Sequence, residues 1–286
     1  MLGLGLGITK PFEGEAFVGL LDTYSGAEAA VSLRRLTASY SGPAITVRSA
    51  GGGDPVNIGF DANGDLDIAA IQSHCGSNDG FVTDWYDQSG NGRRFSQGDA
   101  SKQPQIYIGS STSVITAGAQ GKPALRFVKS EANEMDFGTT ITGVDDWYFV
   151  SAIESNQGTS SSTGVLINSN SNENDRIRIT SGGDTQVRIF GGASFTASSA
   201  LTNGTGAIYA VQRDGSDNIS QFINAGSAVG TGTKSDDWPA FRLLGRNQAG
   251  GNALFLNSDV QELIFYNSIQ SSRVAIETDL KNYYVG

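Results

Sequence analysis

The chain has 286 residues, and its 38 glycines, 6 prolines and 17% charged residues favour many short strands joined by turns over a helical bundle. The formal net charge of −10 argues against nucleic acids and anionic membrane surfaces as partners, because both attract basic proteins. One Cys and one His exclude an internal disulfide framework and any metal site built from several Cys or His ligands.

Residues 1–20 begin with alternating Leu and Gly. A segment of this kind packs poorly alone, so we expect an extended arm that docks on another subunit or on the body of the domain. The segment lacks the basic start and the cleavage site of a secretory signal, and no stretch reaches 18 apolar residues. We therefore expect the protein to be made in the cytoplasm, with residues 21–286 forming a single domain.

The next elements alternate between helix and strand. Residues 25–40 have the Ala and Leu content and the 3.6-residue spacing of a short helix. Strands are predicted at 44–48 and 56–60, and a second helix at 68–74. Cys75 follows that helix on an apolar stretch, where an inert, buried thiol is expected.

An acidic turn precedes the second helix. Asp61, Asn63 and Asp65 alternate as in the first half of a calcium-binding EF-hand loop. The glycine stands at position 4 instead of 6, however, and no Glu occupies position 12. The sequence therefore favours a turn in which Asp65 or Asp67 caps the helix, and no metal or other cofactor is expected.

Residues 85–92 read Trp-Tyr-Asp-Gln-Ser-Gly-Asn-Gly and are the most informative stretch of the chain. An apolar strand ends here in a turn whose two glycines can take positive φ. Asp87 can lock this turn by accepting hydrogen bonds from its amides. The alternative is the floor of a polar pocket that presents Asp87, Gln88 and Asn91.

From residue 104 the pattern is consistently β. Strands are predicted at 105–108, 124–128, 147–153, 165–168, 176–180, 186–190, 206–213, 220–223, 241–244 and 260–266. The chain closes with a helix that starts at Ser271 or Ser272. Many short strands at this spacing, with turn residues between them, indicate an all-β sandwich with a few short helices.

Several segments resemble known proteins. Residues 121–127, 211–215, 222–224 and 259–266 are similar to concanavalin A-like (jelly-roll) and laminin G-like sandwiches. Residues 32–36, 41–43, 47–48 and 86–92 resemble the catalytic domain of the α-L-arabinofuranosidase B family. Residues 20–34 resemble short bacteriophage proteins that carry this domain in tails or virions. The resemblance implies a concanavalin A-like β-sandwich over nearly the whole chain.

The chain departs from the enzyme family at the positions that the resemblance makes catalytic. Arg246 stands where the family has its acid/base aspartate, and no counterpart of the nucleophile motif is found. One family disulfide would join Cys75 to the position of Gly80, and the adjacent Cys pair of the sugar pocket has no counterpart. Retaining hydrolysis requires two carboxyl groups. The resemblance therefore implies a sandwich without the family's glycosidase activity, and no catalytic residue is expected.

These observations lead to one expected function and two alternatives. We expect a bacteriophage virion protein, such as a tail fibre, spike or capsid-surface component, with a lectin-like face for host-surface polysaccharide. The candidate sugar-binding residues are Trp85, Asp87, Asn91, Arg246 and Asn247. Other virion proteins and further copies of the chain are the expected partners, and the virion is the expected location. The alternatives are an arabinofuranosidase-type glycoside hydrolase and a purely architectural virion protein.

Overall fold

The computed structural model describes residues 16–141, 146–157, 163–168, 176–188, 194–233, 241–245 and 254–286. In these residues the chain is all-β, with three short α-helices: α1 (Leu20–Thr23), α2 (Ile68–Cys75) and α3 (Arg273–Tyr284). Short 3-10 turns lie at Gly109–Ser111, Lys129–Glu131 and Ser181–Gly183. None of the helices in the described part of the chain is long and apolar enough to cross a membrane.

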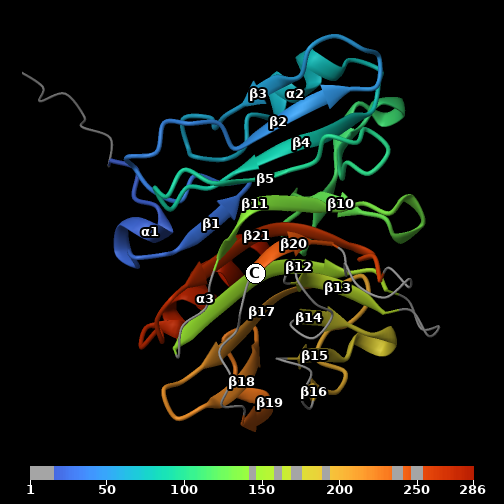
Figure 1. Cartoon of the computed structure of the whole chain (residues 1–286). Coiled ribbons are helices and arrows are strands. Elements are labelled where there is room, and N and C mark those ends of the chain that lie inside the picture. The colour runs from blue at the N-terminus through green and yellow to red at the C-terminus, as the bar shows by residue number, and fades with distance from the viewer. Residues whose placement is uncertain are drawn as a thin grey trace, which may run out of the picture.

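The strands form two antiparallel layers, called the first and second sheet below, which hydrogen-bonded pairing joins into one continuous sheet, and β8 and β9 form a separate two-stranded sheet (Figure 1). The first sheet runs, in spatial order, β3 (Val56–Ile58), β2 (Ile45–Ser49), β4 (Gly80–Tyr86), β5 (Arg94–Ser96), β11 (Met135–Ile141), β20 (Phe241–Leu244), β13 (Gly164–Asn168), β14 (Arg176–Ile179), β15 (Thr185–Arg188) and β16 (Ser194–Ala197).

In the second sheet, β1 (Ala29–Ser32) and β10 (Leu125–Phe127) share one edge of β21 (Ser258–Tyr266). The sheet continues through β12 (Trp147–Ser155), β17 (Gly206–Arg213) and β18 (Asn218–Ile223) to β19 (Ala228–Thr233). Strand β6 (Gln105–Ile108) pairs with both β4 and β10 and so links the sheets. The remaining short strands are β7 (Ser113–Val114), β8 (Thr116–Ala117) and β9 (Lys122–Pro123).

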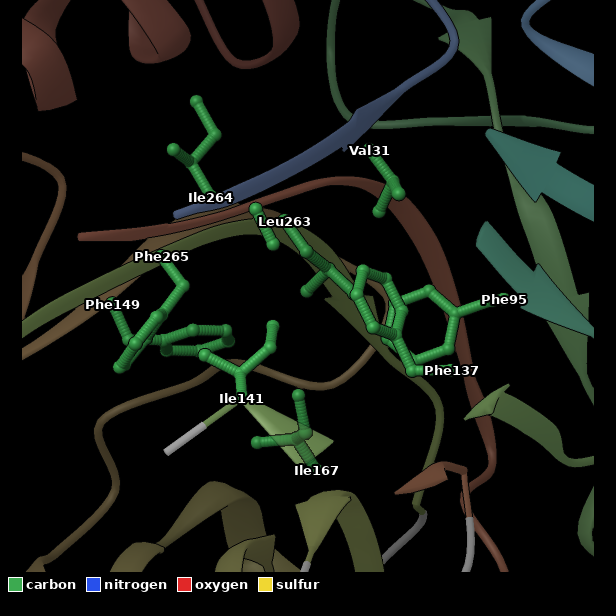
Figure 2. A pocket seen from close by; sticks show the side chains of 10 residues that line it. Val31, Phe95, Phe137, Ile141, Phe149, Ile167, Leu263, Ile264 and Phe265 are labelled. Carbon is green, nitrogen blue, oxygen red and sulfur yellow. The ribbon is translucent and has the colours of Figure 1, made fainter. Parts of the chain in front are cut away.

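The main core lies between the two sheets. Trp85, Phe149, Leu263 and other apolar side chains from both sheets are almost completely buried there. Figure 2 shows the centre of this core, where Phe95 and Phe137 face each other edge to face with ring centroids 4.4 Å apart. A void of about 20 Å³ remains between these side chains. Its walls are apolar and its volume is about that of one or two water-sized spheres, so it is a packing defect rather than a ligand pocket.

A second apolar cluster covers the outer face of the second sheet. Ile276, Leu280 and Tyr284 of α3 pack on this face together with Leu20 of α1. The predicted C-terminal helix is confirmed, with Ser272 at its N-cap. The helix predicted at 68–74 is also confirmed as α2, and the carboxylate of Asp67 caps it by accepting from the Ala70 amide at 3.0 Å.

The helix predicted over residues 25–40 is wrong. The Ala-rich part of this stretch forms β1, whose residues pair with β21 from Ala29↔Phe265 to Ser32↔Glu262. Val31 faces the main core and Ala30 the second cluster. A strand buried on both faces reads as a continuous apolar run, and tertiary pairing overrides the helical preference of alanine.

Candidate functional site

The turn at residues 85–92 is a rigid corner between β4 and the segment that follows β1. Asp87 is 4% exposed and accepts hydrogen bonds from the backbone amides of Ala30 at 2.8 Å and Ser89 at 2.9 Å. Its second carboxylate oxygen accepts from the Ser89 hydroxyl at 2.8 Å. Gly90 and Gly92 take positive φ, at 95° and 69°. Asp87 therefore locks the turn, as its position in the sequence predicts.

Gln88 ties the same corner to the chain after β1. Its side-chain carbonyl accepts from the Leu36 amide at 2.8 Å. Its NH₂ group donates to the carbonyls of Ser32 at 3.2 Å and Arg34 at 3.0 Å. Gln88 is 2% exposed, so all of these bonds lie away from solvent. The side chain replaces a regular strand pairing at this point and fixes the path of residues 32–36.

Trp85 and Asn91 lie on opposite sides of this corner. Trp85 is fully buried in the main core and has no exposed ring face on which a sugar could stack. Asn91 is exposed, and its side-chain NH₂ group donates to the carbonyl of Glu28 at 2.9 Å. Among the sugar-binding residues predicted in the described part of the chain, Asn91 alone reaches an open surface.

That surface is a polar groove on the outer face of the first sheet. Two adjoining depressions share Arg94 and Ser96 and together extend over β2, β4, β5 and β11. Strand register places Thr46 opposite Asp84, Asp84 opposite Ser96, and Ser96 opposite Asp136. Paired residues of neighbouring antiparallel strands point to the same face. A row of four hydrogen-bonding side chains therefore crosses the sheet, opposite the apolar side chains that face the core.

Ion pairs hold the two carboxylates of this polar groove in place. Asp84 contacts the Arg94 guanidinium at 2.7 Å and accepts from the Ser96 hydroxyl at 2.8 Å. Asp136 forms a two-point contact with Arg242, at 2.7 and 3.0 Å. Hydrogen bonding to Asp136 raises the pKa of the Arg242 guanidinium. Bidentate arginine–carboxylate pairs are directional, so the carboxylate oxygens have fixed orientations.

Arg48 lines the far end of the polar groove. Its guanidinium donates to the Gln103 side chain at 2.7 Å and lies 4.9 Å from the centroid of the Phe81 ring. At the near end the groove is bordered by Asn91, Arg93 and Thr139. The groove thus offers carboxylate, amide, hydroxyl and guanidinium groups along its length.

Sequence reasoning identified only Asn91 in this set. Arg246 and Asn247 lie outside the described residues. Gly245, the last residue described before them, follows Leu244, which pairs with Met135 at one end of β11. Asn91 shares its depression with Thr139, toward the other end of the same strand. The sequence feature that could have identified the other groove residues is the alternation of polar and apolar residues in each strand, as in Arg94-Phe95-Ser96. Their convergence in one groove, however, depends on pairings between strands that are distant in the sequence.

The acidic turn does not assemble a metal site. Asp61 accepts hydrogen bonds from the amides of Asn63 at 2.8 Å and Asp65 at 3.0 Å, as a turn-forming aspartate does. Asp65 is directed instead to Lys122, at 3.3 Å, and to the Tyr283 hydroxyl. Within the described ranges, no three His, Cys, Asp or Glu side chains are grouped as ligands.

Cys75 is a free, buried thiol beside Gly80. A Cβ atom placed on Gly80 would lie 2.8 Å from the Cys75 sulfur. Burial raises the pKa of this thiol, and the nearby Asp79 adds to the effect. Positions 75 and 80 are therefore as close in space as the disulfide implied by the family resemblance requires, although this chain has only one of the two cysteines.

Comparison with known proteins identifies solved structures of similar fold. No protein-family model matches the chain, and no curated protein does. Among solved structures, an arabinofuranosidase complexed with arabinofuranosyl-α-1,2-xylobiose is similar, with a TM-score of 0.67 and 16% identity over 94% of this chain. A GH54 α-L-arabinofuranosidase soaked with a cyclic sulfate inhibitor gives a TM-score of 0.64 at the same identity and coverage. This chain spans 66% of the length of each. The chain is thus an all-β sandwich similar in fold to the α-L-arabinofuranosidases.

Proposed function

We propose that the protein is a non-catalytic carbohydrate-binding sandwich whose ligand lies in the polar groove. The observation that carries this proposal is the row Thr46, Asp84, Ser96 and Asp136 across four neighbouring strands. Sugar hydroxyls both donate and accept hydrogen bonds. A row of donors and acceptors held by strand pairing is suited to such a ligand, because little side-chain order must be created on binding.

The charges of the polar groove favour a neutral sugar. Asp84 and Asp136 each have an arginine partner, so neither carboxylate presents an uncompensated charge. A ligand that is rich in hydroxyls can bond to the free lone pairs of these carboxylates without displacing the arginines. Asn91 at the rim adds an amide at the place where the family-like turn enters the groove.

The biological setting that we propose is a bacteriophage virion. Its support is the resemblance of residues 20–34 to phage proteins that carry this domain. The protein would be a tail fibre, spike or capsid-surface component, assembled as a homo-oligomer with other virion proteins, and its ligand would be a host-surface polysaccharide. Mass spectrometry of purified particles, followed by electron microscopy of labelled protein, tests this setting. Absence of the chain from purified particles would refute it.

Glycan-array screening followed by calorimetry tests the polar groove. Asp84→Asn and Asp136→Asn should each weaken binding of the best neutral glycan by about tenfold, because a charge-assisted hydrogen bond contributes about 1.5–3 kcal/mol. Asp61→Asn is the matched control, since it also removes one carboxylate but lies in the turn before α2. If both groove variants bind as tightly as the wild type, the ligand lies elsewhere.

One observation supports the hydrolase alternative. Asp84 and Asp136 are the strand neighbours of the same residue, Ser96, so two carboxylates lie in one groove. Turnover of an arabinofuranoside chromogen, lost in Asp84→Asn or Asp136→Asn, would establish this alternative. A glycan array without hits, together with a position inside a capsid or tail lattice, would instead establish the architectural alternative.

A further inference from the structure

A second polar surface lies on the same outer face of the first sheet, at its other end. Strands β14 and β15 pair in the register Arg176↔Arg188 and Arg178↔Gln186. Residues 177, 179, 185 and 187 of these strands are buried toward the core, so Arg178, Arg188 and Gln186 point outward, while Arg176 is on the same face but only 4% exposed. We call Arg178 and Arg188 the arginine cluster.

The arginine cluster has an unusual charge balance for a protein with a net charge of −10. The described residues within the strands β13, β14, β15 and β16 include no Asp or Glu, and Asp184, in the turn between β14 and β15, accepts from the Ser199 amide at 2.6 Å. Arg178 and Arg188 lie on neighbouring paired strands. Burial, with the neighbouring charge of Arg188, lowers the pKa of Arg178. The positive charges of Arg178 and Arg188 therefore oppose each other on this face.

Hydrogen bonding in the arginine cluster is incomplete. Arg178 donates from Nε to the Gln186 side chain at 2.5 Å. The Nε atom of Arg188 is buried and has no hydrogen-bond partner. A buried, unsatisfied donor on a charged group is costly and is usually explained by a missing partner. The strand neighbours on the open side are Thr196, opposite Gln186, and Ser194, opposite Arg188, and both are exposed.

We propose that Arg178 and Arg188 bind the oxyanion of an acidic sugar residue, a carboxylate or a sulfate group. The guanidinium groups supply charge-assisted, fork-shaped hydrogen bonds to the oxyanion. Gln186, Ser194 and Thr196 supply neutral groups for the sugar hydroxyls. A small acidic sugar is favoured over a nucleic acid, because the net charge of −10 repels a long polyanion while leaving contacts at short range intact.

Isothermal titration with D-glucuronate, D-glucose 6-sulfate and D-glucose tests this proposal. The two acidic sugars should bind and D-glucose should bind at least about tenfold more weakly, with an affinity for the acids that falls as salt is added. The double variant Arg178→Gln/Arg188→Gln should lose about tenfold or more in affinity for the acids. Lys129→Gln/Lys281→Gln is the control, because it changes the net charge equally at sites away from β14 and β15.

Three binding results would overturn the proposal. One is equal binding of D-glucose and D-glucuronate, and another is full retention of binding in the arginine double variant. The third is binding of oligo(dT) that is tighter than that of D-glucuronate and is lost in the double variant, which would identify a nucleic-acid site. Carbohydrate binding in the polar groove is tested separately, with neutral glycans and the aspartate variants.

A stability measurement keeps the test valid if the double variant folds poorly. Without ligand, Arg188→Gln alone should raise the melting temperature, because it removes the positive charge that acts on Arg178. D-Glucuronate should raise the melting temperature of the wild type but not of this variant. A lower melting temperature in ligand-free Arg188→Gln would mean that the fold itself compensates Arg188, and the proposal would fail.

Discussion

The polar side chains in the turn at residues 85–92 have two different roles. Asp87 and Gln88 are buried and satisfy backbone groups of the segment after β1, whereas Asn91 is exposed beside the polar groove. A polar residue inside a turn motif can therefore belong to the fold or to the site, and burial decides between the two. The same criterion removes Trp85 from the sugar-contacting surface.

Alanine at position 88 tests this division. Gln88→Ala leaves the buried Leu36 amide and the carbonyls of Ser32 and Arg34 without their partner, so it should destabilise the fold by about 2–3 kcal/mol. Asn91→Ala removes an exposed amide and should cost less than about 0.5 kcal/mol. Urea unfolding of both variants measures the difference. Equal stabilities would mean that the corner is not held by Gln88.

Much of the corner is local and could be predicted from sequence. Gly90 and Gly92 have positive φ, and Asp87 accepts from the Ser89 amide two residues on, because these features depend only on near neighbours. The polar groove could not be predicted in this way. Thr46, Asp84, Ser96 and Asp136 come from four strands, and their convergence depends on register between β2, β4, β5 and β11. A single sequence does not specify that register.

At the scale of elements, the helices α2 and α3 and the buried strands β12 and β21 followed the hydrophobic pattern, whereas β11, β16 and β19 were not predicted and β1 was predicted as a helix. The C-terminal helix and α2 have one apolar side and were predicted close to their bounds. Within 25–40, all four residues of Ala29–Ser32 are buried, so neither face of this segment is exposed to solvent. The spacing of its apolar residues therefore does not distinguish a strand from a helix. The helix prediction failed there because burial on both faces left no alternation and the alanines favour a helix, whereas β12 and β21, which are also buried, contain β-branched and aromatic residues that favour a strand.

A disulfide between α2 and β4 should form in Gly80→Cys. The new Cβ atom would lie 2.8 Å from the Cys75 sulfur, and Gly80 does not need a positive φ. Tyr107 lies 3.0 Å from the same position and must shift slightly. Oxidation should consume both thiols, as measured by thiol titration and mass spectrometry. Gly59→Cys, at a position with open space, is the control and should keep both thiols free.

The docking of α3 should depend on pH through Glu277. This side chain is fully buried, where it accepts from Arg273 at 2.9 Å and from the Tyr148 hydroxyl at 3.2 Å, and the Ala225 amide also bonds to it. Burial raises its pKa above 4.5, and these hydrogen bonds offset only part of the effect. The folded state therefore holds the proton more tightly than the unfolded state.

The sign of the effect follows from that difference. The raised pKa of Glu277 adds to the free energy of unfolding. This contribution is fully present below the unfolded pKa of 4.5 and is lost as pH rises through the higher folded pKa. The stability of the wild type relative to Glu277→Gln should thus decrease between pH 4 and pH 8. Urea unfolding of both proteins over this range provides the measurement, with Glu131→Gln as an exposed control. A constant difference would show that Glu277 does not change its protonation over this range.

At the scale of the whole molecule, the polar groove and the arginine cluster share the outer face of one sheet. Strands β11, β20 and β13 separate β5 from β14, so four strand spacings, or about 20 Å along the sheet, lie between them. The opposite sheet is covered on its outer face by α3 and α1. A long saccharide could therefore contact both sites on the side of the sandwich that these helices leave open.

Neutral oligosaccharides of increasing length that carry a single terminal D-glucuronate residue test whether the two sites act together. Once a chain spans both sites, the second contact becomes intramolecular and the affinity should rise steeply, by about tenfold or more over D-glucuronate. Asp84→Asn and Arg178→Gln/Arg188→Gln should each remove this rise, because either change leaves one site. A methyl-esterified oligomer of equal length should lose the contribution of the arginine cluster and keep that of the groove. If affinity does not change with length, each site binds its own ligand and the sheet face does not act as one surface.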